Sequence, residues 1–155
     1  MGMQEIKNYY KVNDLLSLGG QPDEEQLKAL SRSGFKVVLN LATINPRYSL
    51  PNEAASVRSL GMTYYHVPVE WGNPTLGDFE SFENVLRQLA GEKMFIHCAS
   101  NFRASAFYAL YALKHLGWSE EQANALMAPI WDGSNYPTWD HFIDALKAAI
   151  KRDAV

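Results

Sequence analysis

Four short runs of apolar, often β-branched residues divide the chain. The clearest is Phe-Lys-Val-Val-Leu-Asn-Leu at residues 35–41, which is short, apolar and β-branched, as buried strands are. Similar runs occupy residues 15–20, 63–69 and 93–97, the first ending in a Gly-Gly turn. The pattern predicts a short extended piece at residues 15–20 and three strands after it.

Between these runs the sequence has the marks of amphipathic helices. The first helix is predicted to open at Pro22, followed by three acidic residues, and to end at Gly34. The segment 103–116 is apolar on most of its circumference, which predicts a central buried helix. Ser119, with Gln122 three positions later, is a capping pattern for another helix. Further helices are predicted at residues 51–60, 78–89 and 138–151.

Strands that alternate with helices, followed by a run of helices, predict an α/β fold. We expect a mostly parallel central sheet with helices on both faces. In such sheets, ligands bind beyond the carboxyl ends of the strands. No internal repeat or low-complexity linker interrupts the chain, so a single domain over residues 1–155 is expected.

Composition narrows the function classes. Hydrophobic residues make up 47% of the chain and charged residues 20%, as in globular proteins. A net charge of -3 and scattered basic residues predict neither nucleic-acid nor membrane binding. A single cysteine forms no internal disulfide. The longest apolar run, residues 104–113, is short for a membrane span. The first residues lack the apolar h-region of a secretory signal peptide. We therefore expect a cytoplasmic protein. The dispersed histidines predict no metal site.

The most informative segment is His97-Cys98-Ala99-Ser100-Asn101-Phe102-Arg103-Ala104-Ser105, which joins the strand at 93–97 to the buried helix. A cysteine at such a turn faces backbone N–H groups and the positive end of the helix dipole. Both stabilise a thiolate and both attract an anion. Arg103 adds a planar cation suited to phosphate or sulfate oxygens. The segment predicts a nucleophilic cysteine that acts on an anionic substrate.

A strand followed by His-Cys, a loop, Arg, Ser and a helix resembles the cysteine-dependent phosphatases of the tyrosine and dual-specificity type. Their motif is His-Cys-x5-Arg-Ser/Thr, with Gly three residues after Cys. The stretches Gly20-Gln21-Pro22-Asp23-Glu24-Glu25-Gln26-Leu27 and Gly34-Phe35-Lys36-Val37-Val38-Leu39-Asn40-Leu41 are similar to a bacterial family of phosphatase-like domains. The resemblance spans roughly residues 15–117 and implies a tyrosine-phosphatase-like fold and hydrolysis of phosphomonoesters without metal or cofactor.

The loop departs from that motif because Arg103 follows Cys98 by five positions instead of six. In one alignment the loop is a residue shorter and Arg103 still faces the anion. In the other the loop has the usual length, Ser105 takes the Ser/Thr position and Ala104 occupies the arginine slot. Asn101 stands where the motif has Gly, and asparagine tolerates left-handed backbone geometry better than most residues.

The resemblance implies a role for each residue of the site. Cys98 would attack phosphorus, Glu70 would protonate the leaving oxygen, and Ser105 would assist the thiolate as leaving group. His97 would support the thiolate through hydrogen bonds in the loop. The phosphate would be bound by the loop residues Ala99, Ser100, Asn101, Phe102 and Arg103.

Two other functions fit the same residues. A Cys-x4-Arg loop is similar to that of rhodanese-like sulfurtransferases, in which the cysteine carries a persulfide. A non-catalytic module that binds a phosphate or another anion would also keep the loop. Structural roles are the simpler alternative for single residues, such as an ion pair for Arg103 or a solvated loop position for Glu70.

Overall fold

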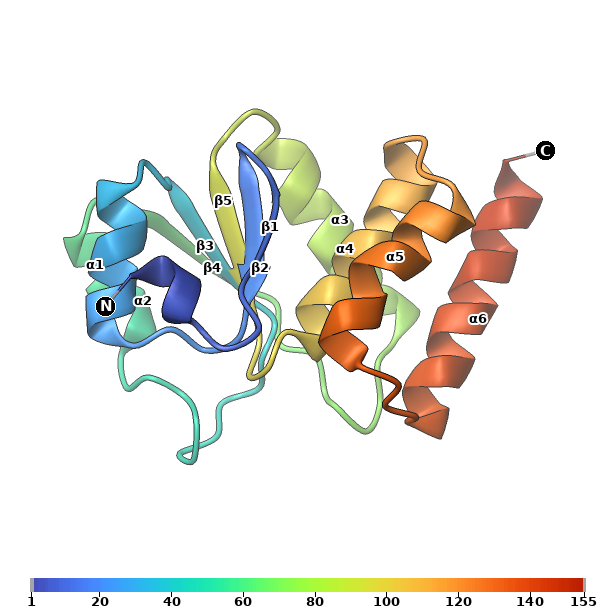
Figure 1. Ribbon diagram of the computed structural model, residues 1–155, viewed down its shortest axis with the longest axis horizontal. Coiled ribbons are helices and arrows are strands. Elements are labelled where there is room, and N and C mark those ends of the chain that lie inside the picture. The colour runs from blue at the N-terminus through green and yellow to red at the C-terminus, as the bar shows by residue number, and fades with distance from the viewer. Residues whose placement is uncertain (1, 155) are drawn as a thin grey trace.

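The computed structural model describes residues 2–154 and has a five-stranded sheet with helices on either side (Figure 1). The strands are β1 (Tyr10–Asn13), β2 (Leu16–Gly19), β3 (Val37–Asn40), β4 (Thr63–His66) and β5 (Met94–His97). They lie in the order β1-β2-β5-β3-β4, and only β1 is antiparallel to its neighbour. The predicted mostly parallel sheet is confirmed.

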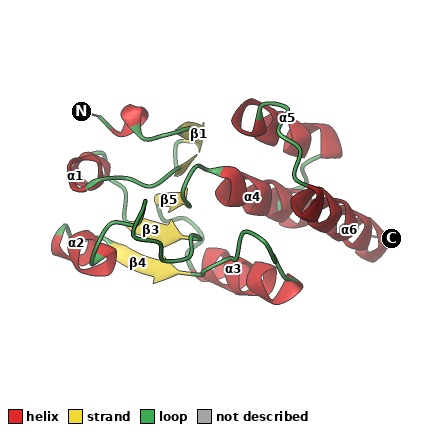
Figure 2. Cartoon of the chain, turned by 90° about the horizontal axis from the view of Figure 1, so that it is seen from below, coloured by secondary structure: helices red, strands yellow, loops and turns green. Residues whose placement is uncertain are grey.

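Helices cover both faces of this sheet, as predicted. In chain order they are the 3-10 helix η1 (Met3–Glu5) and the α-helices α1 (Glu24–Arg32), α2 (Glu53–Ser59), α3 (Leu76–Gln88), α4 (Phe102–His115), α5 (Glu120–Trp131) and α6 (Pro137–Asp153). Figure 2 shows α1 and α2 on one face and α3 and α4 on the other, with α5 and α6 packed beyond α4.

Side chains alternate between two hydrophobic cores along the buried strands, as the pleat of a strand requires. Val38 and Phe95 point into the smaller core, where they meet Leu27 of α1. Leu39 and Ile96 point into the larger core under α3 to α6. Because both faces of β3 and β5 are covered, all four residues of each strand are buried.

Local signals account for several helix ends. The side chain of Asp23 caps α1 by accepting from Gln26 N at 2.8 Å, and Ser119 caps α5 in the same way from Gln122 N at 3.1 Å, as its sequence pattern predicts. Gly34, which follows α1, has a φ of +90°, a conformation that glycine adopts without strain.

Some boundaries differ from the sequence prediction. Strand β1 escaped prediction because it is short and only half buried, at the edge of the sheet. The segment predicted as a strand over 63–69 leaves β4 after His66, opposite the end of its partner β3 at Asn40. Val67 N and Val69 N still donate to Asn40 O and Leu41 O, both at 2.9 Å. Within residues 2–154, none of the helices combines the length and apolar character needed to cross a bilayer.

Candidate functional site

The carboxyl ends of the three central strands are in register. Gly19 at the end of β2 and Asn40 at the end of β3 both pair with His97 at the end of β5. The residue after His97 is Cys98, which is 1% exposed and whose backbone N–H donates to Gly19 O at 3.3 Å. The only cysteine of the chain therefore lies at the ligand-binding edge of the sheet.

The loop from Cys98 turns into α4 at Asn101. This residue has a φ of +73°, in the left-handed region, and its carbonyl accepts from Ser105 N at 3.0 Å. Its side chain donates to Asn8 O at 2.7 Å, and the Asn8 side chain in turn donates to Ser100 O at 2.9 Å. The two asparagines thus form a reciprocal clasp between the N-terminal segment and the loop.

Gly20 lets the chain after β2 approach the loop closely. A Cβ atom on Gly20 would lie 2.6 Å from Ala99 O, so a side chain there would displace the loop. The next residue, Gln21, donates its backbone N–H to that same carbonyl at 3.1 Å. Because the C=O and N–H of a trans peptide point in opposite directions, the N–H of Ser100 points away from Gln21.

A cavity of about 240 Å³ opens in front of the loop. Its lining residues are Trp71, Cys98, Ala99, Ser100, Phe102, Arg103 and Tyr136. Arg103, the second residue of α4, is itself buried and donates from Nη1 to Val69 O at 2.8 Å. This bond leaves the rest of the guanidinium fork for a bound anion.

The aromatic rings of Trp71, Phe102 and Tyr136 form part of the cavity wall. Trp71 packs edge-on against Tyr136, with ring centroids 5.0 Å apart, and stacks on Trp139 at 5.4 Å. Trp139 also donates from Nε1 to Trp71 O at 2.7 Å. Phe102 stacks on Trp131 at 4.9 Å. These contacts hold Trp71 in place and give the cavity an apolar rim.

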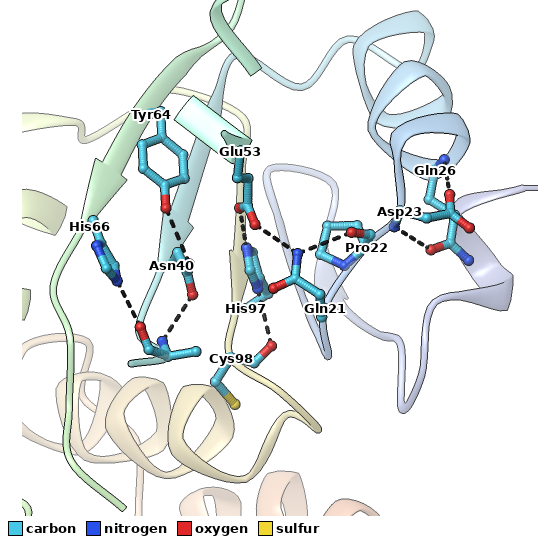
Figure 3. A network of polar contacts seen from close by, with 11 residues as sticks. Gln21, Pro22, Asp23, Gln26, Asn40, Glu53, Tyr64, His66, His97 and Cys98 are labelled. Carbon is cyan, nitrogen blue, oxygen red and sulfur yellow. Dashed lines mark hydrogen bonds and ion pairs between the residues drawn. The ribbon is translucent and has the colours of Figure 1, made fainter. Parts of the chain in front are cut away.

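Behind the loop lies a buried polar network (Figure 3). His97 Nε2 is 2.6 Å from Glu53 Oε2, and His97 Nδ1 is 3.1 Å from Cys98 O. Gln21 donates from Nε2 to Glu53 Oε1 at 2.6 Å. Burial raises the pKa of Glu53, but the charge of His97 and hydrogen bonds from His97 and Gln21 outweigh it, so the net shift is downward. Glu53 is therefore an ionised carboxylate at neutral pH.

The structure brings most of the predicted site residues together. Cys98, Ala99, Ser100, Phe102 and Arg103 all line the cavity, and Ala104 is buried in the larger core. Asn101 is buried and holds the loop through the clasp.

Glu70 and Ser105 lie outside this lining. Glu70 is exposed, next to Trp71. The hydroxyl of Ser105 donates to Phe102 O at 3.1 Å and lies 3.1 Å from Trp131 Nε1, which donates to it. Their catalytic roles stay predictions.

Sequence reasoning missed the residues that support the loop from behind. Glu53 is 44 positions from His97 in the chain, and no local pattern links the two. The signal for Gln21 was present in the Gly-Gln-Pro stretch quoted for the family resemblance, without a role attached to it. No group of three His, Cys, Asp or Glu side chains that could hold a metal ion occurs within residues 2–154.

The chain is similar in sequence and in fold to known proteins. A family model described as "DSP-PTPase phosphatase fused to NAD+ Kinase" matches residues 4–131. The crystal structure of a DUF442 protein from Shewanella putrefaciens CN-32 superimposes with a TM-score of 0.87, at 32% identity over 96% of each chain. PTPMT1 in complex with PI(5)P has the same fold, with a TM-score of 0.74, 19% identity and coverage of 95% of this chain and 99% of its own.

Among curated proteins, the Beta-lactamase hydrolase-like protein of Xylella fastidiosa (strain Temecula1) is 29% identical over 102 residues. The match covers 64% of this chain and 23% of that protein, so the chain corresponds to about a quarter of its length.

Proposed function

This chain belongs to the DSP-PTPase phosphatase family described as fused to NAD+ kinase, and from that premise we propose that it hydrolyses phosphomonoesters through a cysteinyl-phosphate on Cys98. One observation carries the proposal: Cys98, the loop after it and the Arg103 guanidinium share the wall of one cavity at the N-terminus of α4. Loop N–H groups, a helix N-terminus and a buried arginine together form an anion site.

The reaction has two displacements. In the first, the Cys98 thiolate forms a bond to phosphorus, the bond to the leaving oxygen breaks, and that oxygen takes a proton. Glu70 is the proposed donor of this proton, and its exposed side chain would have to turn toward the cavity to deliver it. In the second, water attacks phosphorus and gives a proton to the Glu70 carboxylate left by the first step, and the sulfur leaves as thiolate, releasing inorganic phosphate. Ser105 is proposed to donate a hydrogen bond to the departing sulfur.

The geometry supports binding roles for the loop residues, Arg103 and His97. The phosphate oxygens would accept hydrogen bonds from the loop N–H groups and from the free edge of Arg103. His97 would act from behind the loop, through the carbonyl of Cys98. The placement of Arg103 in the cavity wall supports the alignment in which the shortened loop keeps its arginine in use.

The test is turnover of para-nitrophenyl phosphate and a panel of phosphomonoesters. We expect Cys98→Ser to lower kcat by about a thousandfold or more and Arg103→Lys to lower kcat/KM by about a hundredfold. Arg87→Lys, an exposed arginine on α3, is the matched control and should leave both constants unchanged. A folded protein that turns over no phosphomonoester would refute the proposal, and phosphate binding without turnover would identify an anion-binding module.

Sulfur transfer is the second candidate, and the length of the loop favours it. Four residues separate Cys98 from Arg103, as in rhodanese-like loops, and the exposed Glu70 lies outside the lining of the cavity. In this reaction the thiolate takes the outer sulfur of thiosulfate and sulfite leaves. The resulting persulfide then gives that sulfur to cyanide as thiocyanate. No proton donor for an alcohol is needed. A Cys98 adduct of about 32 Da with thiosulfate:cyanide activity would establish this function in place of the first.

A further inference from the structure

The carboxylate of Glu53 contacts both arms that hold the Cys98 loop from behind. One arm is His97, whose Nε2 lies 2.6 Å from Glu53 and whose Nδ1 lies 3.1 Å from the carbonyl of Cys98. The other arm is Gln21, whose side chain donates to Glu53 and whose backbone N–H donates to the carbonyl of Ala99. A single buried carboxylate thus connects to two consecutive carbonyls of the loop.

The ring of His97 has an acceptor at each nitrogen. A carbonyl oxygen only accepts, so Nδ1 carries a hydrogen toward Cys98 O. A carboxylate only accepts as well, so Nε2 carries a hydrogen toward Glu53. Donation from both nitrogens at once requires a doubly protonated ring, and such a pair is a buried dipole whose positive end adjoins the nucleophile.

Few other charges face this pair. His66 and Tyr64 approach it from β4, and Arg58 of α2 lies beyond Tyr64. Burial, with a smaller contribution from the charge of Glu53, raises the pKa of Tyr64, so its hydroxyl stays neutral. On the strand of His97 itself, the neighbouring ring is the uncharged Phe95, stacked at 5.8 Å. Glu53 is therefore the direct counter-ion of His97.

We propose that Glu53 is a positioning residue, which keeps His97 doubly protonated and so stabilises the thiolate of Cys98. The trans peptide geometry gives the mechanism. With the Cys98 and Ala99 carbonyls held toward His97 and Gln21, the N–H groups of Ala99 and Ser100 point the other way, toward the cavity. The imidazolium adds a positive charge next to the sulfur-bearing residue. The catalytic role of Glu53 rests on the proposed function. The effect of Glu53 on the ionisation of the Cys98 thiol does not.

Glu53→Gln is the informative change because it removes the charge and keeps the shape. The Gln amide donates to His97 Nε2, so the ring remains neutral while Nδ1 still donates to Cys98 O. Glu83→Gln is the matched control. Glu83 is also buried and also lies against a histidine, His115, with Oε2 2.5 Å from Nε2, but it joins α3 to α4 away from the cavity.

The readout is the rate of alkylation by iodoacetamide against pH, followed by intact mass. The chain has one cysteine, so each adduct reports on Cys98. We expect the pH midpoint of alkylation to rise by about one unit in Glu53→Gln, with about tenfold slower alkylation below the midpoint, and to stay in place in Glu83→Gln. Equal midpoints in the wild-type protein and folded Glu53→Gln would overturn the proposal.

A second measurement needs no variant. In the wild-type protein with ¹⁵N-labelled histidine, the His97 ring should show both nitrogens protonated at neutral pH. A neutral His97 ring with one bare nitrogen would contradict the proposal even if Glu53→Gln failed to fold. Neither measurement needs turnover, so a shifted alkylation midpoint in a chain that hydrolyses no phosphomonoester would reject the proposed function and leave this inference standing.

Discussion

Two carboxylate–histidine pairs, each with a buried glutamate, share nearly the same contact and differ in surroundings. In the first, the side chains of Glu53 and His97 are 5% and 0% exposed. In the second, those of Glu83 and His115 are 7% and 25% exposed, and Lys114 adds a second cation 2.9 Å from the same Glu83 oxygen. Glu53 has one counter-ion sealed from water, whereas Glu83 has two that reach the surface.

What each histidine contacts on the side away from its glutamate explains the difference in role. His97 continues to the carbonyl of Cys98, whereas His115 packs against the ring of Tyr111 at 4.7 Å, in the last turn of α4. The first pair contacts a loop, and the second fastens one helix to another. Under the proposal above, the same two residue types serve chemistry in one place and packing in the other. Comparing matched variants of the two pairs separates these roles.

The largest difference should come from removing each histidine. His97→Ala leaves Glu53 buried without a counter-ion, and breaking a buried pair in this way costs about 3–5 kcal/mol. His115→Ala leaves Glu83 paired with Lys114, so we expect a loss of about 1 kcal/mol. Urea denaturation at neutral pH measures both. Equal losses would show that burial does not distinguish the two pairs.

A smaller difference is expected in acid. Burial raises the pKa of both glutamates. Their hydrogen-bonded and charged partners lower it by more than burial raises it, so the net shift in pKa is downward for each. A lowered folded-state pKa gives stability that is present above the unfolded value of 4.5 and lost as the pH falls through the folded value. The free energy of unfolding of the wild-type protein should thus fall between about pH 5 and pH 3.

The two glutamine variants show how much of this loss of stability in acid comes from each pair. Glu53→Gln should flatten the acid dependence more than Glu83→Gln, because water screens the second pair. Urea titrations at several acidic pH values give the slopes. An unchanged slope in Glu53→Gln would mean that Glu53 is not ionised in the folded protein.

The smallest effect concerns salt. Lys114 is 37% exposed, so Lys114→Met should lower the free energy of unfolding by about 0.5 kcal/mol at low ionic strength. The difference should vanish near 1 M NaCl, where the Debye length is about 3 Å. The destabilisation by Glu53→Gln should not change with salt, since its pair is sealed. A salt-dependent effect at Glu53 would place water at that carboxylate.

The features that could be predicted from the sequence are those that depend on residues adjacent in the chain. The short apolar run before His97, the turn at Cys98 and the apolar segment after Arg103 follow one another in the chain, so the strand, loop and helix could be inferred from pattern alone. The mostly parallel sheet followed from the alternation of strands and helices. Strand β1 was missed because its four residues, alternately half-buried and exposed, are too short a run to stand out.

What could not be predicted depends on contacts between distant segments. Glu53 was missed because its contact with His97 exists only once α2 has packed against β4 and α1. For Glu70, the sequence placed the residue on the loop after β4 but could not say which way it faces, and the side chain is exposed. Tyr136 reaches the cavity from the turn before α6, which no motif marked.

The asparagine clasp has a consequence for local unfolding of the chain. Asn8 and Asn101 bind each other's backbone segments, and Gly20 N adds a bond to Lys7 O at 2.7 Å. The N-terminal segment cannot detach without releasing the outer edge of the loop, so the two should open as one cooperative unit in hydrogen exchange. By linkage, an anion that fills the cavity would slow amide exchange along residues 3–9, although it touches none of them.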